Sequence, residues 1–445
     1  MPSFQDLHEL VDAHRKDVDK LMPQEHGYSF FAPDYAHEYI EHQHWRERHD
    51  DSYRSPLRVG RLAGWLIPAK DLSDVAGLPT SFGSVQRTRW ADKTDEFIDK
   101  YLQQGALVPG KTLTPELGLC AYTEPVGLPA PENPLYPGAT PGGSTGGGAA
   151  MVARGLVRAA HASDGGGSIR VPAAACGIVG FKPAHDTAGA NPVVQGFVCR
   201  SVHDCAWLYP QVPAAKTGVG TGARAKVCAD NAQVAGKAQV HRPLRIGVLS
   251  TPVHAEVEVS EDMLIALDYT ARILGQAGHE VYPVARPYGD QPFQAFHDVL
   301  SLRCATIRGE ASPLVSWLRE RGQSLSEQRA AQARQIFLSV DSLLRTAWDC
   351  DLLLTPTLAF DPPPVGFFAA QAPPDDFYAQ TQWTPWATMF NMSGGAALSM
   401  PVPLSGRPPV GIHLGAIHGS TADIFAAAYA LDAAAAPHQE VNCVH

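Results

Sequence analysis

The sequence predicts an α/β fold around a large hydrophobic core. Short apolar runs bounded by turn residues alternate with segments of helical spacing, which is typical of a sheet covered by helices. One stretch, residues 244–284, has the pattern of a complete strand–helix–strand unit. The 445 residues are 45% hydrophobic and 18% charged, a composition that favours a well-buried globular core over disorder.

The first hundred residues are expected to form helices and then short strands. Apolar side chains recur at helical spacing in residues 4–50, with charged residues at the other positions. Residues 62–69 (LAGWLIPA) are a short apolar run between turn residues, which predicts a buried strand ending at Lys70. A helix over residues 93–104 and a second strand over residues 105–108 are expected to follow.

The central part of the chain predicts a buried helix and then a surface loop. Residues 149–161 have helix composition and are apolar almost all round, so we expect a buried helix. Residues 213–243 are rich in Ala, Gly, Lys and Thr and lack apolar periodicity, which favours an exposed loop or insertion.

The strand–helix–strand unit has recognisable boundaries. Its strands are expected at residues 244–249 and 281–284, with Ser260 as the N-cap of the helix and Gly278 as its stop. Residues 351–357 (DLLLTPT) are expected to form a further buried strand.

Charge and cysteine usage narrow the functional class. The net charge of −10, without any Lys/Arg-rich run, argues against a nucleic-acid partner. Eight cysteines without a Cys-x-x-Cys pair suit a reducing cytoplasm, and no zinc or dithiol motif is visible. The N-terminus lacks the apolar region of a signal peptide, and no run of apolar residues is long enough to span a membrane. We therefore expect a cytoplasmic protein.

Two motifs resemble ligand sites but have plainer interpretations. Residues 105–112 (GALVPGKT) fit the P-loop pattern, yet the first glycine opens the apolar run instead of following it, so a strand and turn are favoured over a nucleotide site. His37 and His42 are five residues apart, whereas a zinc-binding helix places its histidines four apart. A solvated helix is favoured there.

Two glycine-rich blocks present serines on backbone that can approach a reacting group. Residues 142–148 contain Ser144, and residues 163–170 contain Ser168 directly after three glycines. Successive glycine amides can converge on one oxygen as an oxyanion hole, with Ser168 as a nucleophile at its edge. The base is less clear, because no histidine has a marked context. Lys70 is a candidate, since desolvation lowers a lysine pKa, although Asp71 could neutralise it instead.

At this point the sequence resembles the amidase signature family. The closest match is residues 138–183, which carry GGSTGGG, an Ala-rich segment, DGGGSIRVP and CGIVGFKP. Residues 61–84, 105–118, 351–357 and 388–401 resemble further landmarks of the family in the same order. The resemblance covers residue 58 to the end. It implies a single large α/β/α domain with a central twisted mixed β-sheet over residues 58–445. The helical spacing of the first fifty residues adds an N-terminal helical segment, residues 1–57, that packs on this core.

The resemblance also implies a Ser–cis-Ser–Lys triad for the hydrolysis of an amide. By motif, Ser168 is the nucleophile, Ser144 the bridging serine after a cis peptide, and Lys70 the base. The implied oxyanion hole consists of the amides of Gly165, Gly166, Gly167 and Ser168, and the implied supporting residues are Thr145, Asp164 and Arg170. No metal or organic cofactor is implied. The expected partner is a small amide, anilide or carbamate, with an ester as a possible side substrate, and the expected oligomeric state is a monomer or homodimer.

This sequence departs from the family pattern in places, and two alternatives stay open. Thr145 stands where the family has a serine, Gly148 replaces another serine, and residues 123–134 are unusually rich in proline. Residues 1–57 and 285–345 are expected to shape the substrate entrance. Trp317, Trp348, Trp383 and Trp386 could form an aromatic wall, although core packing is the simpler expectation. The alternatives are a non-catalytic amidase-like binding module and an amidotransferase-type subunit, although no Tyr-Asp-Gly-x-Arg segment of the latter is present.

Overall fold

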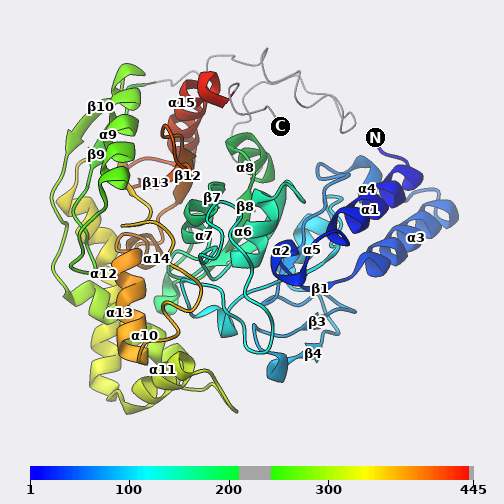
Figure 1. The fold of residues 1–445 in the computed structure, drawn as a ribbon, viewed down its shortest axis with the longest axis horizontal. Coiled ribbons are helices and arrows are strands. Elements are labelled where there is room, and N and C mark those ends of the chain that lie inside the picture. The colour runs from blue at the N-terminus through cyan, green and yellow to red at the C-terminus, as the bar shows by residue number, and fades with distance from the viewer. Residues whose placement is uncertain (210–241, 440–445) are drawn as a thin grey trace.

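The computed structural model describes residues 1–209 and 242–439, and an eight-stranded mixed sheet lies at its centre (Figure 1). Three neighbouring strands at one end pair in parallel, and all later pairs are antiparallel. In spatial order the strands are β10 (Glu280–Pro283), β9 (Arg245–Val248), β11 (Leu352–Pro356), β13 (Val410–Ala416), β12 (Ala397–Val402), β7 (Val179–Lys182), β8 (Val194–Cys199) and β6 (Ala159–Asp164).

Helices cover both faces of this sheet. One face contacts α8 (Val202–Leu208), α9 (Glu261–Gln276) and α15 (Thr421–Gln439). The other contacts α6 (Gly146–Ala153) and α7 (Arg170–Ala175), and it carries α12 (Glu327–Ala347) and α14 (Met389–Met392) nearer β11. Successive side chains of β11 point to opposite faces of the sheet. Leu352 and Leu354 pack in the hydrophobic core beneath α9, and Leu353 packs in the core beneath α12. The predicted α/β/α architecture is therefore confirmed.

A further helical group extends from the second face. α10 (Gln291–Cys304) contacts both α11 (Pro313–Ser324) and α12, and α11 contacts α13 (Pro373–Trp383). In Figure 1, α10, α11 and α13 lie together, and α10 joins this group to α12.

The N-terminal region adds helices and two small sheets. Its helices are α1 (Phe4–Val18), α2 (Pro23–His26), α3 (Pro33–His49), α4 (Pro56–Val59) and α5 (Glu96–Leu102). A three-stranded sheet joins β1 (Tyr28–Phe31), β5 (Gly110–Thr112) and β2 (Ala69–Lys70), and a two-stranded sheet joins β3 (Pro79–Thr80) and β4 (Arg89–Trp90). The short 3-10 helices are η1 (Val85–Arg87), η2 (Glu116–Gly118) and η3 (Ala188–Ala190).

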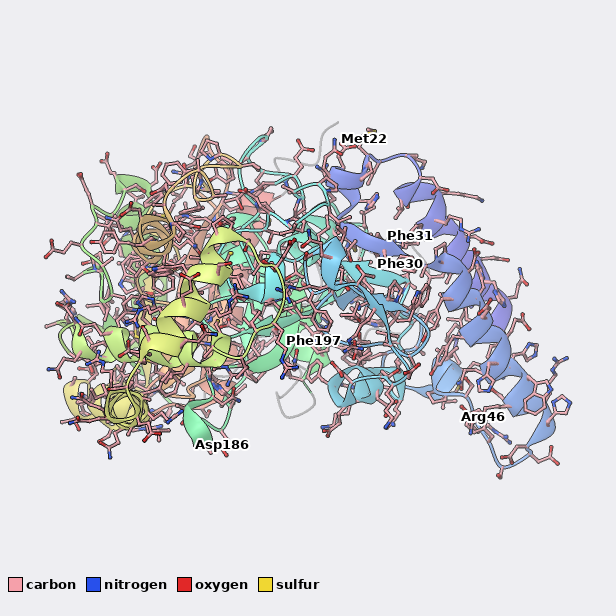
Figure 2. All side chains as sticks on the ribbon, turned by 90° about the horizontal axis from the view of Figure 1, so that it is seen from below. Met22, Phe30, Phe31, Arg46, Asp186 and Phe197 are labelled. Atoms are coloured by element: carbon pink, nitrogen blue, oxygen red, sulfur yellow. The ribbon has the colours of Figure 1, made fainter. Side chains whose placement is uncertain are left out.

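Side chains from this region join a core shared with later parts of the chain. Leu7, Val11 and Ile40 pack in one cluster with Met151 of α6 and Val198 of β8. In Figure 2, Phe197 of β8 lies in the interior, whereas Met22 and Arg46 lie at the margin of the N-terminal helices. The division of the chain at residue 57 stays a prediction.

Several predicted elements are confirmed, including the strand–helix–strand unit and the strand at residues 351–357. α9 begins directly after Ser260, although the serine side chain makes no capping hydrogen bond. Gly278 has a left-handed φ of 93° and follows the end of the helix, as expected. Of the predicted loop over residues 213–243, residues 213–241 lie outside the described residues.

Three predicted boundaries are wrong. The expected helix over residues 149–161 ends at Ala153, because Gly155 turns the chain at φ 77°, and β6 begins at Ala159. The expected strand over residues 62–69 is reduced to β2, and the one over residues 105–108 is displaced to β5. Each apolar run is buried as expected, but the two touch through a single bridge between Leu66 and Leu107. A proline follows that bridge in each run, and its missing N–H prevents a continuous ladder.

Two further expectations concern the first fifty residues and the membrane. The expected helices form, but β1 interrupts them because residues 28–31 pair with β5. Within the described ranges, no helix combines the length and the apolar character that crossing a bilayer requires.

Candidate active site

Three segments that are distant in sequence bring Lys70, Ser144 and the glycine loop together. Lys70 ends β2, which lies against β6. Ser144 follows a cis peptide after Gly143 and precedes α6, so the expected cis bond is present. Ser168 follows the glycine loop that connects β6 to α7. Because α6 and β6 pack on each other, both serine loops lie at the same edge of the fold.

Lys70 lies at the bottom of this arrangement and is fully buried. Its Nζ lies 2.7 Å from Ser144 Oγ, 3.0 Å from Thr145 Oγ1 and 3.1 Å from Ser163 Oγ. Burial lowers the pKa of Lys70 to about 7, and the Asp164 carboxylate only partly opposes this effect. Near neutral pH a large fraction of this lysine is an uncharged amine that can accept a proton.

The carboxylate next to Lys70 in sequence is occupied elsewhere, which corrects the alternative that Asp71 neutralises the lysine. Asp71 Oδ1 lies 3.0 Å from Lys111 Nζ, and both side chains are buried. Lys111 also donates to Thr80 Oγ1 at 2.8 Å. Lys111, the lysine of the P-loop-like pattern, lies on β5 and belongs to this buried ion pair. The only helix that follows β5 closely is the short η2. This arrangement lacks the strand–loop–helix context of a P-loop.

Thr145 connects the buried lysine to the nucleophile loop. Its hydroxyl lies 3.0 Å from Lys70 Nζ and donates to the backbone carbonyl of Ser168 at 2.6 Å. The substitution of threonine for the usual serine therefore retains the hydroxyl and its hydrogen bonds.

Ser168 is the most accessible of the three predicted triad residues. It is partly exposed, whereas Ser144 and Lys70 are buried. No hydrogen bond joins the Ser168 hydroxyl to another residue within the described part of the chain. The structure thus connects Lys70 to Ser144 and leaves the Ser168 hydroxyl available to a ligand.

Asp164 and Arg170 form a buried ion pair that fixes the glycine loop. The Asp164 carboxylate accepts two bonds from the Arg170 guanidinium, both at 2.9 Å, and one from Asn391 Nδ2 at 2.9 Å. It also accepts the amides of Gly167 at 2.7 Å and Ile169 at 3.1 Å. Burial alone would raise the pKa of the Asp164 carboxyl, but Arg170, together with Lys182 and Asn391, outweighs burial and holds that pKa well below its usual range. The carboxylate stays charged and orients the loop.

The hydrogen bonds of the Asp164 carboxylate correct one member of the predicted oxyanion hole. The Gly167 amide already donates to Asp164, so it does not point at the position of a substrate oxygen. Within the described residues, the amides of Gly165, Gly166 and Ser168 have no hydrogen-bond acceptor. Gly165 and Gly166 are partly exposed, and a side chain at Gly166 would come within 3.4 Å of the Phe296 ring. Three unpaired amides in one loop can stabilise a developing oxyanion.

Three residues near Lys70 and Ser144 were not predicted from the sequence to lie at the site. Ser163 contacts Lys70. In the sequence, only its position directly before Asp164 could have indicated this contact. His161 Nδ1 accepts the Lys70 amide at 3.1 Å, and burial lowers the pKa of this histidine to about 3, so it is neutral. Gly118 packs so closely on Ser144 that a Cβ there would lie 3.2 Å from Ser144 Oγ.

The remaining candidates from the sequence lie elsewhere. Trp383, Trp386 and Trp348 are buried in the core, and Trp317 is partly exposed beside His297. His37 lies on α3 and hydrogen-bonds Asp12 and His8. Within the described residues, no group of three or more His, Cys, Asp or Glu side chains is arranged to hold a metal ion.

Comparison with known proteins agrees with this geometry. The family described as Amidase matches residues 34–423. The chain is 30% identical over 400 residues to a putative amidase, AmiC, of Mycobacterium leprae (strain TN), with 82% of this chain and 81% of the relative covered. It is 29% identical over 412 residues to the 6-aminohexanoate-cyclic-dimer hydrolase of Paenarthrobacter ureafaciens, with 82% of each covered.

A solved structure shows the same fold. The crystal structure of a bacterial aryl acylamidase of the amidase signature family matches with a TM-score of 0.78 at 21% identity, over 98% of this chain and 97% of that one. The family match spans most of the chain and includes every residue of the site described above. The chain therefore belongs to the amidase family, whose members are the amidase signature enzymes, and it is an amidase-type hydrolase that acts on C–N bonds.

Proposed function

We propose that this amidase cleaves small linear carboxylic amides through an acyl-enzyme on Ser168, with Ser144 as the proton bridge and Lys70 as the base. The observation that carries the proposal is the buried Lys70 amine 2.7 Å from Ser144 Oγ, with a pKa of about 7. A buried lysine without a carboxylate partner is costly to keep charged, and its neutral form is a base matched to neutral pH.

In the first step, Ser168 Oγ attacks the amide carbonyl. The Ser168 proton passes to Ser144 Oγ while the Ser144 proton passes to Lys70 Nζ. The carbonyl oxygen becomes an oxyanion, which the amides of Gly165, Gly166 and Ser168 stabilise. The relay then runs in reverse to protonate the leaving nitrogen as the C–N bond breaks. Water attacks the resulting ester through the same relay and releases the acid.

The proposal requires a contact between Ser168 and Ser144 that forms when substrate binds. The free hydroxyl of Ser168 can adopt another staggered rotamer at little cost, because no hydrogen bond holds it. Catalytic hydrogen bonds often tighten only in the substrate complex. The deeper contact, between Lys70 and Ser144, is formed already.

The substrate class is proposed from the relatives. One relative is a hydrolase of the 6-aminohexanoate cyclic dimer, and the structural neighbour is an aryl acylamidase. Aliphatic amides, anilides and carbamates are therefore the first compounds to examine, with esters as a side activity. We also infer a cytoplasmic location, since the six described cysteines are all free and buried.

Competition between water and hydroxylamine tests the acyl-enzyme. An anilide and an ester with the same acyl group should give the same ratio of hydroxamate to acid, because both pass through one intermediate. Ser168→Ala should abolish both products, and Ser339→Ala, an exposed serine on α12, should change neither. Ratios that differ between the two substrates would show that water attacks the amide directly and would overturn the proposal.

A further inference from the structure

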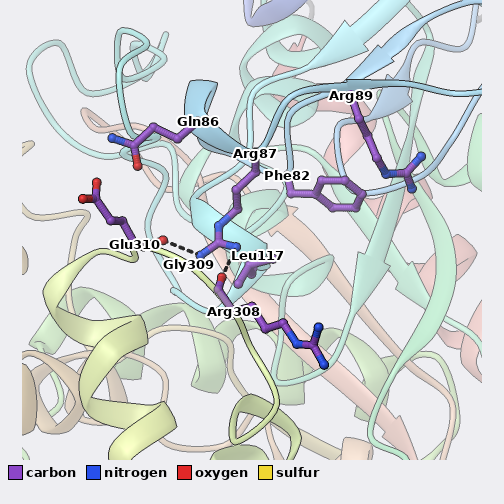
Figure 3. A pocket seen from close by; sticks show the side chains of 8 residues that line it. All are labelled: Phe82, Gln86, Arg87, Arg89, Leu117, Arg308, Gly309 and Glu310. Carbon is purple, nitrogen blue, oxygen red and sulfur yellow. Dashed lines mark hydrogen bonds between the residues drawn. The ribbon is translucent and has the colours of Figure 1, made fainter.

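A pocket of about 650 Å³ that is rich in arginine lies between the turns around Phe82 and Leu117 and the connection that follows α10. Its wall includes Arg87, Arg89 and Arg308, together with Phe82 and Leu117 (Figure 3). The arginines come from η1, from β4 and from the connection between α10 and α11. The pocket is therefore assembled from two parts of the chain that are more than 200 residues apart, as the Arg87 contact to the Arg308 carbonyl shows.

The pocket adjoins the predicted triad through two short connections. Leu117 is followed by Gly118, whose missing side chain allows close contact with Ser144. Phe82 donates its amide to the carbonyl of Asp71, the residue after Lys70, at 3.1 Å. Leu117 in turn donates to the Phe82 carbonyl at 2.7 Å. Two residues of the pocket wall are thus hydrogen-bonded to each other and to the residue that follows Lys70.

Phe82 and Leu117, the two apolar residues of the pocket wall, have an unfavourable backbone conformation. Phe82 and Leu117 both have a φ of 54°, and among the described residues only Ala190 is a further non-glycine residue with positive φ. Bulky side chains rarely adopt this region, and such residues gather at ligand sites. Both residues lie on one wall of the pocket, where hydrogen bonds to neighbouring turns hold them.

The three arginines differ in how far their charge is neutralised. Arg87 is held by Glu116 at 2.6 Å and donates to the carbonyls of Arg308 and Glu310, so it fixes the pocket wall. Arg89 pairs with Asp74 at 2.7 Å. The exposed Arg308 guanidinium has no ion pair or hydrogen bond to any residue in the described ranges.

One end of the pocket is therefore cationic. The side chains of Arg89 and Arg308 extend to the same side of Arg87, whereas the Glu310 carboxylate lies on the opposite side (Figure 3). Guanidinium groups bind carboxylates through paired hydrogen bonds, and here the partner would come from a ligand.

We propose that this pocket binds a carboxylate carried by the substrate, so that the amidase prefers acidic amides to neutral ones. The proposal rests on the function assigned above to Ser168. Arg308, supported by Arg89, holds the carboxylate in the pocket, and the adjoining wall of Leu117 and Gly118 directs the amide toward Ser144 and Ser168. The substrate class is then a monoamide of a short dicarboxylic acid, or an amide whose amine portion bears an acid.

Two matched anilides test this preference. N-(4-nitrophenyl)succinamic acid carries the carboxylate, and 4′-nitrobutyranilide is its neutral counterpart. Wild-type enzyme should show the higher kcat/KM for the acidic anilide, and Arg308→Ala should reduce that value about fivefold or more while leaving the neutral anilide nearly unchanged. Arg308→Glu should reduce it further. Added salt should weaken the preference, because exposed charges are screened.

Arg334→Glu is the matched control. Arg334 is exposed on α12, has no ion pair within the described residues and gives the same change of charge as Arg308→Glu. A loss that Arg334→Glu reproduces would reflect net charge, and equal kcat/KM values for the two anilides in wild type and in Arg308→Ala would equally overturn the pocket assignment.

Binding separates this proposal from the proposed catalytic function. Calorimetric titration of the intact protein should show that the acidic anilide binds more tightly than the neutral one, and that Arg308→Ala removes the difference. This result is expected whether or not the anilides are hydrolysed. Equal binding of the two anilides would reject the pocket even if Ser168 is the nucleophile, and hydrolysis that persists in Ser168→Ala would reject the catalytic role alone.

Discussion

At the scale of single residues, the proposed mechanism depends on the uncharged form of Lys70. Burial lowers the pKa of this lysine to about 7, far below the ordinary lysine value of about 10.4. Only the neutral amine can take the proton from Ser144. We therefore expect kcat/KM for a neutral anilide to rise with pH through about 7 and to level off above it.

A pH profile of kcat/KM, measured with an anilide that does not itself ionise, checks this expectation. The direction follows from the charge: raising the pH deprotonates the lysine and increases the active fraction. A profile that stays level across neutral pH, or one that falls as the pH rises, would mean that Lys70 is not the base. Lys100→Met, at an exposed lysine on α5, should leave the profile as it is.

Thr145 permits a second experiment on a single residue. Its hydroxyl contacts Lys70 Nζ and donates to the Ser168 carbonyl. Thr145→Ser keeps the hydroxyl and should keep kcat/KM within about threefold, whereas Thr145→Val removes one contact of Lys70 and the donor to the Ser168 carbonyl and should lower it about tenfold or more. Steady-state kinetics of the two variants decides. Equal activity of the serine and valine variants would remove Thr145 from the catalytic machinery.

At the scale of elements, the loop between β6 and α7 is held by the Asp164–Arg170 ion pair. Both side chains are fully buried, and the carboxylate also binds the Gly167 and Ile169 amides. Asp164→Asn leaves the Arg170 charge buried and unpaired, so it should lower the free energy of unfolding by about 3–5 kcal/mol. Urea unfolding measures this change.

Asp268→Asn on α9 provides the comparison, because Asp268 and Arg272 form an ion pair four residues apart that is exposed at both ends. That variant should change the free energy of unfolding by less than about 0.5 kcal/mol. Similar losses in the two variants would show that the buried pair does not fix the loop.

The turn at η2 positions Ser144 from the other side. Gly118 has a φ of 69°, and a Cβ there would lie 3.2 Å from Ser144 Oγ and 2.5 Å from Leu72 Cδ1. Gly118→Ala should therefore displace Ser144 and lower kcat/KM by up to about 10²-fold. Gly138→Ala is a close control, since Gly138 has a φ of 80° and open space around the Cβ position.

Both glycine variants carry the same left-handed backbone cost of about 1–2 kcal/mol. Thermal unfolding should show this loss in both variants, with a further loss in Gly118→Ala from its close contact with Leu72, and kinetics should separate the two variants. A Gly118→Ala enzyme that is as active as Gly138→Ala would show that Ser144 tolerates displacement.

At the scale of the whole molecule, the sequence was sufficient for the fold class and for the ordered motifs of the family. Lys70 and Ser144 were proposed from those motifs, and the structure places their side chains in contact. The cis peptide before Ser144 was also expected and is present. Element boundaries were less accurate, because the Ala-rich run after Ser144 suits a buried helix and a buried strand equally well.

Contacts between distant segments were beyond the sequence. The pairing of Asp71 with Lys111, which leaves Lys70 without a carboxylate partner, depends on β2 and β5 lying side by side. The Gly167 amide was assigned to the oxyanion hole because its bond to Asp164 depends on the folded shape of the loop. The pocket joins Arg89 to Arg308 across the fold, and no local pattern marks either residue.

The most direct test of the central claim is to map the site of covalent labelling by a fluorophosphonate. Tandem mass spectrometry of the wild-type enzyme should place one adduct on the peptide that contains Ser168, because the serine relay activates that hydroxyl. Ser168→Ala should remain unlabelled, and Lys70→Met should be labelled far more slowly while retaining its fold. An adduct on any other residue, or equal labelling of Ser168→Ala, would contradict the assignment of Ser168 as the nucleophile.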